Sequence, residues 1–156
     1  MALTADEVRS RMQVFMETCA RAGIKITPQR TEIFREVART EEHPDAETLF
    51  RRLRRRMPNV SLDTVYRTLC LLEELQLVSK VELLCDRARF DAKREPHHHF
   101  VCVECGRVRD LECPQWDRCA APREAKAMGA VRSVHVQFRG VCGECEAKKR
   151  RKTKRP

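Results

Sequence analysis

The sequence predicts an α+β fold, an N-terminal winged helix-turn-helix followed by a small α/β domain with a zinc-ribbon-like four-cysteine site. Three observations support this prediction. Four helical segments precede a short hairpin, the residue pattern changes after Asp91, and two C-x-x-C pairs lie in the second half of the chain. A chain of 156 residues can hold two such small domains.

The first two helices are indicated by periodicity and by capping residues. Apolar residues recur at three- and four-residue spacing between Val8 and Cys19, as on one face of a helix. Thr27 is a good N-cap and Pro28 suits the first helical position, so a second helix is expected to begin there.

Two further helices and a hairpin complete the first domain. The third helix is expected over residues 45–56 and the fourth over residues 62–76, with Ser61 as the N-cap of the fourth. Residues 78–84 and 88–91 are predicted to form two short strands. A winged helix-turn-helix has this element order and places its last helix in the major groove of DNA; an unrelated helical bundle is the alternative.

The start of the fourth helix carries residue types that contact DNA grooves. Arg67 can read a guanine edge or hold a phosphate, and the sequence leaves both roles open. The candidate DNA contacts are Ser61, Thr64, Tyr66 and Arg67. The third helix is densely basic, which suits either a solvated face or contact with phosphates.

The domain boundaries follow from changes in composition. A charged, proline-containing segment follows Asp91 and is expected to be a hinge. Beyond it, strands are expected at residues 99–103, 107–111 and 134–140, with a helix at 114–128. The expected division is 1–91 for the DNA-binding domain, 92–96 for the hinge, 97–147 for the second domain and 148–156 for a basic, disordered tail.

Composition and charge limit the classes of protein to which the chain can belong. Hydrophobic residues make up 42% and charged residues 35% of the chain, as in a globular protein. No secretory signal follows Met1 and no apolar run approaches the roughly 18 residues that span a bilayer, so we expect a cytoplasmic protein without a membrane partner. The net charge is +9, but most of the excess lies in the C-terminal tail, where it indicates only non-specific affinity for phosphates.

The two C-x-x-C pairs are the most specific chemical signal in the chain. Each pair can place two thiolates on one ion, and two pairs complete a closed tetrahedral zinc site, which is structural because no position remains for a substrate. The four residues are Cys102, Cys105, Cys142 and Cys145. Ordinary thiols or two disulfides are the alternative, which a reducing compartment disfavours. We expect the loss of any one of the four to unfold the second domain.

The other cysteines have no spacing typical of a metal site. Cys19 and Cys70 lie on apolar helical faces and are expected in the core. Cys85, Cys113 and Cys119 are candidates for free thiols, the last two with a possible redox role.

A second metal site is indicated by histidines and carboxylates on both sides of the hinge. His97 and His99 share one face of a strand because side chains alternate, whereas His98 faces the other way. The candidate ligands are His43, Asp91, His97, His99 and Asp110. A chance polar cluster is the alternative for the three consecutive histidines, and an ordinary loop residue is the alternative for His43.

Imidazole and carboxylate ligands without thiolate suit ferrous iron, manganese or zinc. If His43 and Asp91 belong to the first domain and the other three ligands to the second, one ion clamps the hinge. Its occupancy would then set the angle between the domains, because the ion favours the arrangement that it binds more tightly.

Together these residues closely resemble the ferric uptake regulator family over nearly the whole chain. The matching stretches are residues 26–30 (ITPQR), 43–44 (HP), 64–67 (TVYR), 89–91 (RFD), 97–102 (HHHFVC) and the two C-x-x-C pairs. The resemblance implies a homodimer with an N-terminal winged helix and a C-terminal dimerisation domain. It also implies repression of promoters through a palindromic operator in double-stranded DNA when the sensing metal is bound.

Within the family, the ligand set resembles that of the peroxide-sensing branch (PerR), in which an aspartate stands at the place of Asp110. In that branch bound ferrous iron reacts with hydrogen peroxide, a ligand histidine is oxidised and DNA is released. By residue match the candidates for oxidation here are His43 and His97. The third metal site of many iron sensors is not expected, because Pro96 occupies one ligand position and His135 is displaced by one residue from the other.

Other functions remain open on the sequence alone. Iron, zinc or manganese homeostasis is the alternative within the family. A zinc hydrolase would use His97, His99 and a carboxylate, but no general base stands out, so no enzymatic activity is expected. A zinc-ribbon interaction module without DNA would leave the winged-helix pattern unexplained.

Overall fold

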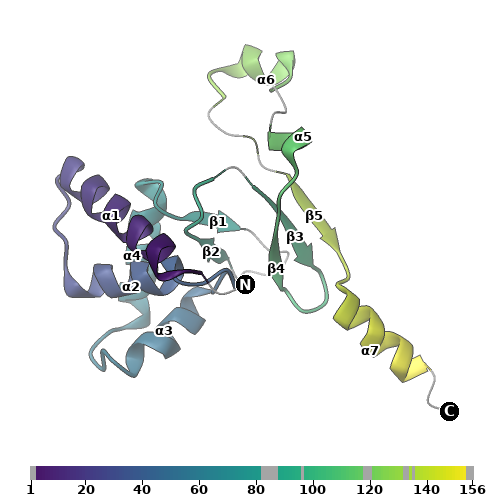
Figure 1. Ribbon diagram of the computed structural model, residues 1–156, viewed down its shortest axis with the longest axis horizontal. Helices are drawn as coiled ribbons and strands as arrows, with labels where there is room; N and C mark the ends of the chain where they lie inside the picture. The colour runs from purple at the N-terminus through teal and green to yellow at the C-terminus, as the bar shows by residue number, and fades with distance from the viewer. Residues whose placement is uncertain are drawn as a thin grey trace. The chain divides into compact units, whose positions relative to one another are not determined.

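The computed structural model describes residues 3–81, 88–95, 97–117, 121–131, 134 and 136–153. The chain divides between Arg94 and Glu95 into unit 1 (Met1–Arg94) and unit 2 (Glu95–Pro156). Unit 1 contains the helices coloured purple to teal in Figure 1, and unit 2 contains the strands and helices coloured green to yellow.

Within the described part of the chain, none of the helices has the length and apolar character needed to cross a membrane.

Each of the four helices of unit 1 begins at a side-chain cap. They are α1 (Ala5–Arg21), α2 (Pro28–Ala38), α3 (Ala46–Arg54) and α4 (Leu62–Glu74). The caps are Thr4, Thr27, Asp45 and Ser61, and each side-chain oxygen accepts a hydrogen bond from the backbone amide three residues later. The four predicted helices and the predicted caps at Thr27 and Ser61 are therefore confirmed.

The end of α4 differs from the prediction, which extended this helix to residue 76. Gln76 adopts a left-handed conformation with φ 55°. Its amide donates to the carbonyl of Glu73, and the amide of Leu77 donates to the carbonyl of Leu72, which is the hydrogen-bond pattern of a Schellman motif. The helix therefore ends at Glu74, and the chain turns there toward the hairpin.

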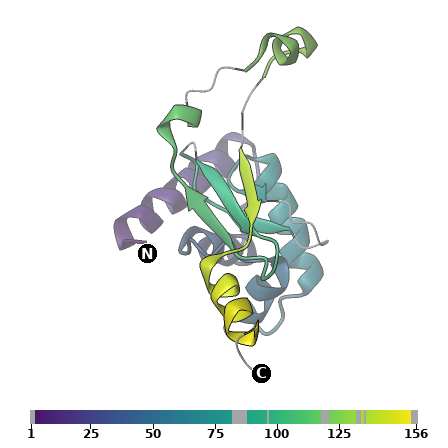
Figure 2. The ribbon, with the colours of Figure 1, turned by 90° about the vertical axis from the view of Figure 1, so that its right-hand side faces the viewer.

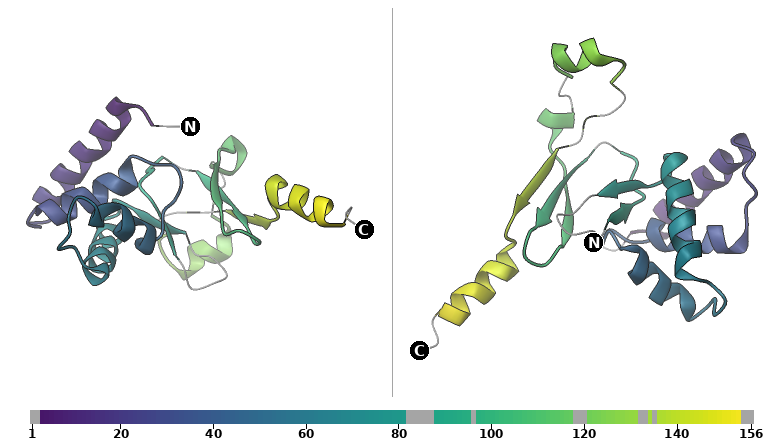
Figure 3. Two further views of the ribbon diagram at one scale, coloured as in Figure 1. Left: turned by 90° about the horizontal axis from the view of Figure 1, so that it is seen from below. Right: turned by 180° about the vertical axis from the view of Figure 1, so that it is seen from behind.

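The core of unit 1 is built around α2, which packs against α1, α3 and α4. Phe15 of α1 and Phe34 of α2 stack with their ring centroids 4.8 Å apart, and both are buried. Strands β1 (Ser79–Val81) and β2 (Arg89–Asp91) follow α4 as an antiparallel pair, seen from two sides in Figure 3. The predicted extension of the first strand over residues 82–84 and its turn at 85–87 lie outside the described residues.

A charged side chain also lies within this core. Glu36 of α2 is 0% exposed. One carboxylate oxygen accepts a hydrogen bond from Arg56, just after α3, and the other is 2.8 Å from Nη2 of Arg39. The buried carboxylate therefore ties α2 to the connection between α3 and α4.

Unit 2 is a three-stranded sheet with helices at both ends. The strands are β3 (His98–Cys102), β4 (Val108–Leu111) and β5 (Gln137–Gly140), and their order is β4-β3-β5. β3 runs antiparallel to β4 and parallel to β5. Helix α5 (Pro114–Asp117) follows β4 and α7 (Gly143–Thr153) follows β5, so Figure 2 shows them at opposite ends of the sheet.

Two expectations for unit 2 are wrong. The predicted helix 114–128 is two short helices, α5 and α6 (Arg123–Met128), because Pro122 lacks an amide hydrogen and disfavours a helical conformation in the residue before it. The predicted disordered tail is helical up to Thr153, because α7 begins at the second C-x-x-C pair and continues through good helix formers. Residues 154–156 lie outside the described residues.

Candidate metal centres

Four cysteine sulfurs converge in unit 2. The Sγ atoms of Cys102, Cys105, Cys142 and Cys145 all lie within 4.8 Å of one another. Those of Cys105 and Cys142 are 3.9 Å apart. Four thiolates about 2.3 Å from a tetrahedral zinc ion would lie roughly 3.8 Å from each other, so the cluster fits zinc.

The sheet and one tight turn bring the two cysteine pairs together. Cys102 ends β3, and Gly106 completes the turn after the first pair with φ 65°, a conformation that favours glycine. Because β5 runs parallel to β3 with Gly140 opposite Cys102, the second pair emerges beside the first. The amide of Cys142 then donates to Sγ of Cys102 at 3.3 Å, and Cys145 follows in the first turn of α7.

The surroundings of the cluster favour a thiolate at Cys102. Burial raises the pKa of this thiol, but hydrogen bonds from the amides of Cys142, Cys105 and Glu104 outweigh that effect and lower its pKa to about 6. At Cys145 the hydrogen bond with the Cys142 thiol, and then burial, raise the pKa to about 12. Without a cation, the four sulfurs therefore cannot all be ionised at neutral pH, whereas a bound zinc ion would stabilise every thiolate.

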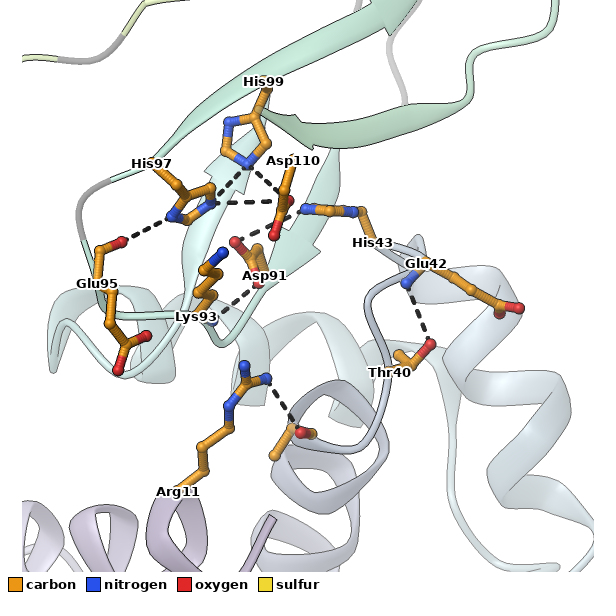
Figure 4. A network of polar contacts seen from close by, with 11 residues as sticks. Arg11, Thr40, Glu42, His43, Asp91, Lys93, Glu95, His97, His99 and Asp110 are labelled. Atoms are coloured by element: carbon orange, nitrogen blue, oxygen red, sulfur yellow. Dashed lines mark hydrogen bonds and ion pairs between the residues drawn. The ribbon is translucent and has the colours of Figure 1, made fainter. Parts of the chain in front are cut away.

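A second cluster of ligand atoms lies on one face of the sheet of unit 2. Nε2 of His97 and Nε2 of His99 are 2.9 Å apart, and Oδ1 of Asp110 lies 3.9 and 3.8 Å from them (Figure 4). Both imidazoles are buried. Adjacent nitrogens bound at about 2.1 Å to one ion would lie roughly 3.0–3.4 Å apart, so this arrangement fits a divalent metal.

Backbone groups fix these side chains in place. Asp110 pairs directly with His99 in the register of β3 and β4, as the sequence predicted for a partner strand. Nδ1 of His97 lies 2.8 Å from the carbonyl oxygen of Glu95, which only accepts hydrogen bonds, so Nδ1 is the donor. In the neutral imidazole Nε2 therefore carries the lone pair and is ready to bind a metal.

His98 is separated from these ligands by the alternation of the strand, as predicted. Its Nδ1 accepts a hydrogen bond from the amide of Val136 at 3.3 Å. Its ring meets the edge of Trp116, with centroids 5.9 Å apart, and Trp116 stacks on Phe138 at 4.8 Å. This aromatic group holds β3, β5 and α5 together. The sequence analysis did not identify it, because Trp116 shows no periodic relation to the strands.

In unit 1, His43 lies beside Asp91. His43 Nε2 and Asp91 Oδ2 are 3.7 Å apart, and the two side chains are 1% and 4% exposed. Figure 4 shows the His43 ring directed toward the Asp91 carboxylate, whose other oxygen accepts a hydrogen bond from the amide of Lys93 at 2.8 Å. His43 has a left-handed backbone with φ 49°, which is uncommon outside glycine and is typical of functional sites.

Contacts between the loop of His43 and strand β2 hold this conformation. The amide of Phe90 donates to the carbonyl of Pro44 at 3.1 Å. Arg89 donates to the His43 carbonyl at 3.5 Å and pairs with Asp45, the cap of α3, at 3.7 Å. The strand that carries Asp91 therefore also positions His43, although the two residues are far apart in sequence.

The predicted DNA contacts lie at the start of α4. The Ser61 hydroxyl accepts from the Thr64 amide at 3.0 Å and lies 2.8 Å from the Thr64 hydroxyl, so both side chains help to cap the helix. Tyr66 and Arg67 are exposed, and Arg67 pairs with Asp63 at 2.9 Å. A hollow of about 300 Å³ lies between α4 and the first turn of α2. This polar, partly basic surface suits contact with a nucleic acid.

Several arginines in and after α3 already contact other residues of unit 1. Arg52 pairs with Glu42 at 2.6 Å, and Arg56 pairs with the buried Glu36. Arg54 lies 5.9 Å over the ring of Phe50. The basic third helix is therefore partly structural.

Outside the four-cysteine cluster, the cysteines divide between core and surface. Cys19 is buried, as predicted. The expectation of a buried Cys70 is wrong, because α4 turns Leu69 and Leu72 inward and leaves position 70 exposed. Cys113 is half-buried. Cys85 and Cys119, like the candidate third-site positions Pro96 and His135, lie outside the described residues.

Comparison with known proteins gives one consistent result. The chain is 27% identical over 148 residues to the peroxide-responsive repressor PerR of Staphylococcus aureus, covering 95% of this chain and all of that protein. Its fold is similar to that of the Helicobacter pylori ferric uptake regulator, with TM-score 0.72, 24% identity and coverage of 94% and 97% of the two chains. A zinc-bound manganese uptake regulator is similar with TM-score 0.61, 25% identity and coverage of 81% and 97%.

The match to a family model extends across both units. Residues 21–139 match the model of the ferric uptake regulator family, and this region includes α2, α3 and α4 and the histidine-containing strand β3. Proteins of this family are dimeric, metal-responsive regulators that bind DNA and are not enzymes. Because the matched region is most of the sequence, the chain belongs to the ferric uptake regulator family.

Proposed function

We propose that this regulator is a repressor that senses hydrogen peroxide through oxidation of a histidine that binds ferrous iron. The observation that carries the proposal is the buried pair of imidazoles, His97 and His99, facing the carboxylate of Asp110. Such nitrogen and oxygen ligands accept a redox-active ion without a thiolate that would itself be oxidised. The similarity to the peroxide-responsive repressor of Staphylococcus aureus, over the whole length of that protein, supports the same function.

Zinc and the sensing metal have separate places in this proposal. The structural zinc ion binds the four-cysteine cluster of unit 2, where it is closed off from any further ligand. The sensing ion binds His97, His99 and Asp110 of unit 2 together with His43 and Asp91 of unit 1. The close approach of the ligand atoms within each unit, and their burial, support this assignment.

Binding by both units would make the ion a switch. Three ligands belong to unit 2 and two belong to unit 1, so an ion bound by all five holds the units in one arrangement. The ion stabilises that arrangement to the extent that it binds this arrangement more tightly than the other arrangements of the two units. In a two-fold dimer the arrangement sets the separation of the two α4 helices, and two such helices on one duplex require a palindromic operator. Ser61, Thr64, Tyr66 and Arg67 are the proposed contacts.

The chain's own residues determine where oxidation occurs. Ferrous iron, when bound, supplies the electron that reduces hydrogen peroxide and so generates an oxidant beside the imidazoles. His43 and His97 are the proposed targets. Oxidation adds one peroxide oxygen to the ring carbon between the two nitrogens. The ring gives up two electrons in all, one of which returns to the iron, and the proton of that carbon leaves with the second peroxide oxygen as water. The oxidised ring is a poorer ligand, so the two units are no longer held together and DNA is released. A repressor must reach the promoters of the chromosome, and the proposed cytoplasmic location allows this.

Regulation of iron, zinc or manganese uptake is the second candidate. The same histidines and aspartate can bind any of these ions, and the similarity to the zinc-bound manganese uptake regulator supports this alternative. In that case metal concentration alone would control operator binding, and hydrogen peroxide would leave the histidines unchanged.

The experiment uses the dimeric protein, purified without oxygen and with its zinc retained. One portion is loaded with ferrous iron and a matched portion with Mn²⁺, and each is bound to a promoter duplex before a small dose of hydrogen peroxide. The proposal expects the iron-loaded protein alone to release DNA, with one added oxygen atom on His43 or His97 in peptide mass spectra. Unchanged binding and unmodified histidines in the iron-loaded protein would contradict it and favour metal homeostasis.

A further inference from the structure

The second half of α7 carries a concentration of positive charge that neither metal centre uses. We call the residues Lys148, Lys149, Arg150 and Arg151 the basic segment of α7. All four are exposed, and α7 buries no side chain among its described residues. Packing therefore does not explain why this helix carries these residues.

The basic segment has a fixed starting point on unit 2. Helix α7 begins between the cysteines of the second pair, where Cys142 contacts Cys102. One turn from the end of the described helix, Lys149 pairs with Glu104, the residue before Cys105, at 2.6 Å. The segment is thus attached to both halves of the zinc cluster and is not a free tail.

Among the described residues, Lys149 is the one member of the segment that an acidic side chain pairs with, so most of its charge is not neutralised. Glu144, in the first turn of α7, pairs instead with Arg107 and with Arg109 of β4, the latter at 3.5 Å. Within the part of the chain that the structure describes, Arg150 and Arg151 make no ion pair. Attraction to the helix dipole accounts for one or two cations at a C-terminus, but not for an unbroken run of them.

The distribution of charge around the helix indicates the kind of partner. Successive residues of a helix are about 100° apart, so four consecutive cations face nearly every direction. The helix then has no apolar face for insertion into a membrane surface, and none for packing in a groove of another protein. A linear polyanion such as duplex DNA, with one charge per ~1.7 Å of its axis, can meet several of these cations at once.

We infer that the basic segment of α7 contacts DNA phosphates beyond the bases contacted by α4. The protein binds DNA as a family member, so a duplex engaged by α4 is tethered to the same chain that carries α7. A dimer brings two basic segments to the same duplex. The segment adds affinity that is independent of sequence and sensitive to salt, while α4 determines which sequence is bound.

The test is the salt dependence of DNA binding by the zinc-containing, Mn²⁺-loaded dimer. Fluorescence anisotropy would measure the Kd for a promoter duplex and for a random-sequence duplex of the same length. Arg150→Gln/Arg151→Gln is compared with the wild type and with Arg123→Gln/Lys126→Gln, which removes two exposed charges from α6 instead. Zinc content, dimer mass and circular dichroism would show that both variants are folded.

Removing two charges from each protomer removes four from the dimer. We expect the slope of log K against log salt to fall by about 3 to 4 on both duplexes, while the preference for the promoter sequence is retained. The α6 control should keep the wild-type slope. If Arg150→Gln/Arg151→Gln also keeps the wild-type slope and affinity, α7 does not contact DNA and the inference is overturned. A loss confined to the promoter duplex would also overturn it, because phosphate contacts do not depend on sequence.

Discussion

Removal of zinc is expected to unfold unit 2 and to leave unit 1 folded. Among the described residues of unit 2, the buried apolar side chains outside the cysteine cluster are Val101 and Val108. Burial of two valines stabilises a fold by about 1.5–3 kcal/mol each, whereas a structural zinc ion contributes roughly 10 kcal/mol or more. Unit 1 has its own core of residues from all four helices and β2. The substitution Cys105→Ser should therefore unfold unit 2 alone.

Two optical signals separate the units. Trp116 is the single tryptophan of the chain and stacks on Phe138, so its fluorescence reports on unit 2. Far-ultraviolet circular dichroism is dominated by α1 to α4 and reports on unit 1. We expect Cys105→Ser to shift tryptophan emission toward that of a solvated indole and to lose zinc, while most of the helical signal remains. Cys113→Ser, a cysteine outside the cluster, is the matched control and should retain both signals.

Either of two results would refute this reasoning. Native tryptophan emission in zinc-free Cys105→Ser would show that the sheet of unit 2 is stable without metal. Loss of fluorescence and helical signal in one cooperative transition would show that unit 1 depends on unit 2, despite the separate core that its helices form.

Four further predictions follow from individual residues. Glu36→Gln should lower the free energy of unfolding by about 1–3 kcal/mol in urea titrations, because the buried carboxylate loses a charged hydrogen bond from Arg56 and an ion pair with Arg39, whereas the exposed Glu74→Gln should leave it unchanged. Asp110→Asn should weaken Mn²⁺ binding at least tenfold in calorimetry without loss of zinc; equal Mn²⁺ affinity would remove Asp110 from the site. Zinc affinity should fall as pH decreases below about 9, because zinc must displace the proton of Cys145, whose pKa the hydrogen bond with the Cys142 thiol raises to about 12, whereas Cys102, with its pKa lowered to about 6, adds to the fall only below pH 6; chelator competition would measure it, and a flat profile would contradict it. Arg67→Gln should reduce promoter affinity by about 1–3 kcal/mol if Arg67 reads a base, and a loss that is equal on all duplexes would assign it to a phosphate.

Local patterns in the sequence predicted much of the fold and both clusters. Helix caps such as Thr27 and Ser61 act on amides three residues away, so their effect does not depend on the rest of the structure. The alternation that places His97 and His99 together and His98 apart is likewise a property of one strand. The spacing within each cysteine pair is also a local feature, because it concerns one turn of the chain.

Features that depend on tertiary contacts could not be predicted in this way. The conformation of His43 depends on hydrogen bonds with β2, which is far away in sequence. Glu36 is buried because Arg56 and Arg39 compensate its charge, and no local pattern indicates such a partner. The helical continuation through Arg151 was missed because a run of like charges usually indicates disorder, whereas here the zinc cluster starts the helix and Lys149 binds back to Glu104.

The two metal centres differ in what they can control. All four sulfurs of the cysteine cluster belong to unit 2, so zinc bound there stabilises that unit equally in every arrangement of the chain. In the proposed sensing site the ligands come from both sides of the division at Arg94, so its occupancy changes the relative free energy of those arrangements. Each 1.4 kcal/mol of differential affinity shifts that equilibrium about tenfold. Under the proposed mechanism, oxidation of one histidine would need to weaken only one ligand to release DNA, and the zinc-stabilised fold of unit 2 would persist.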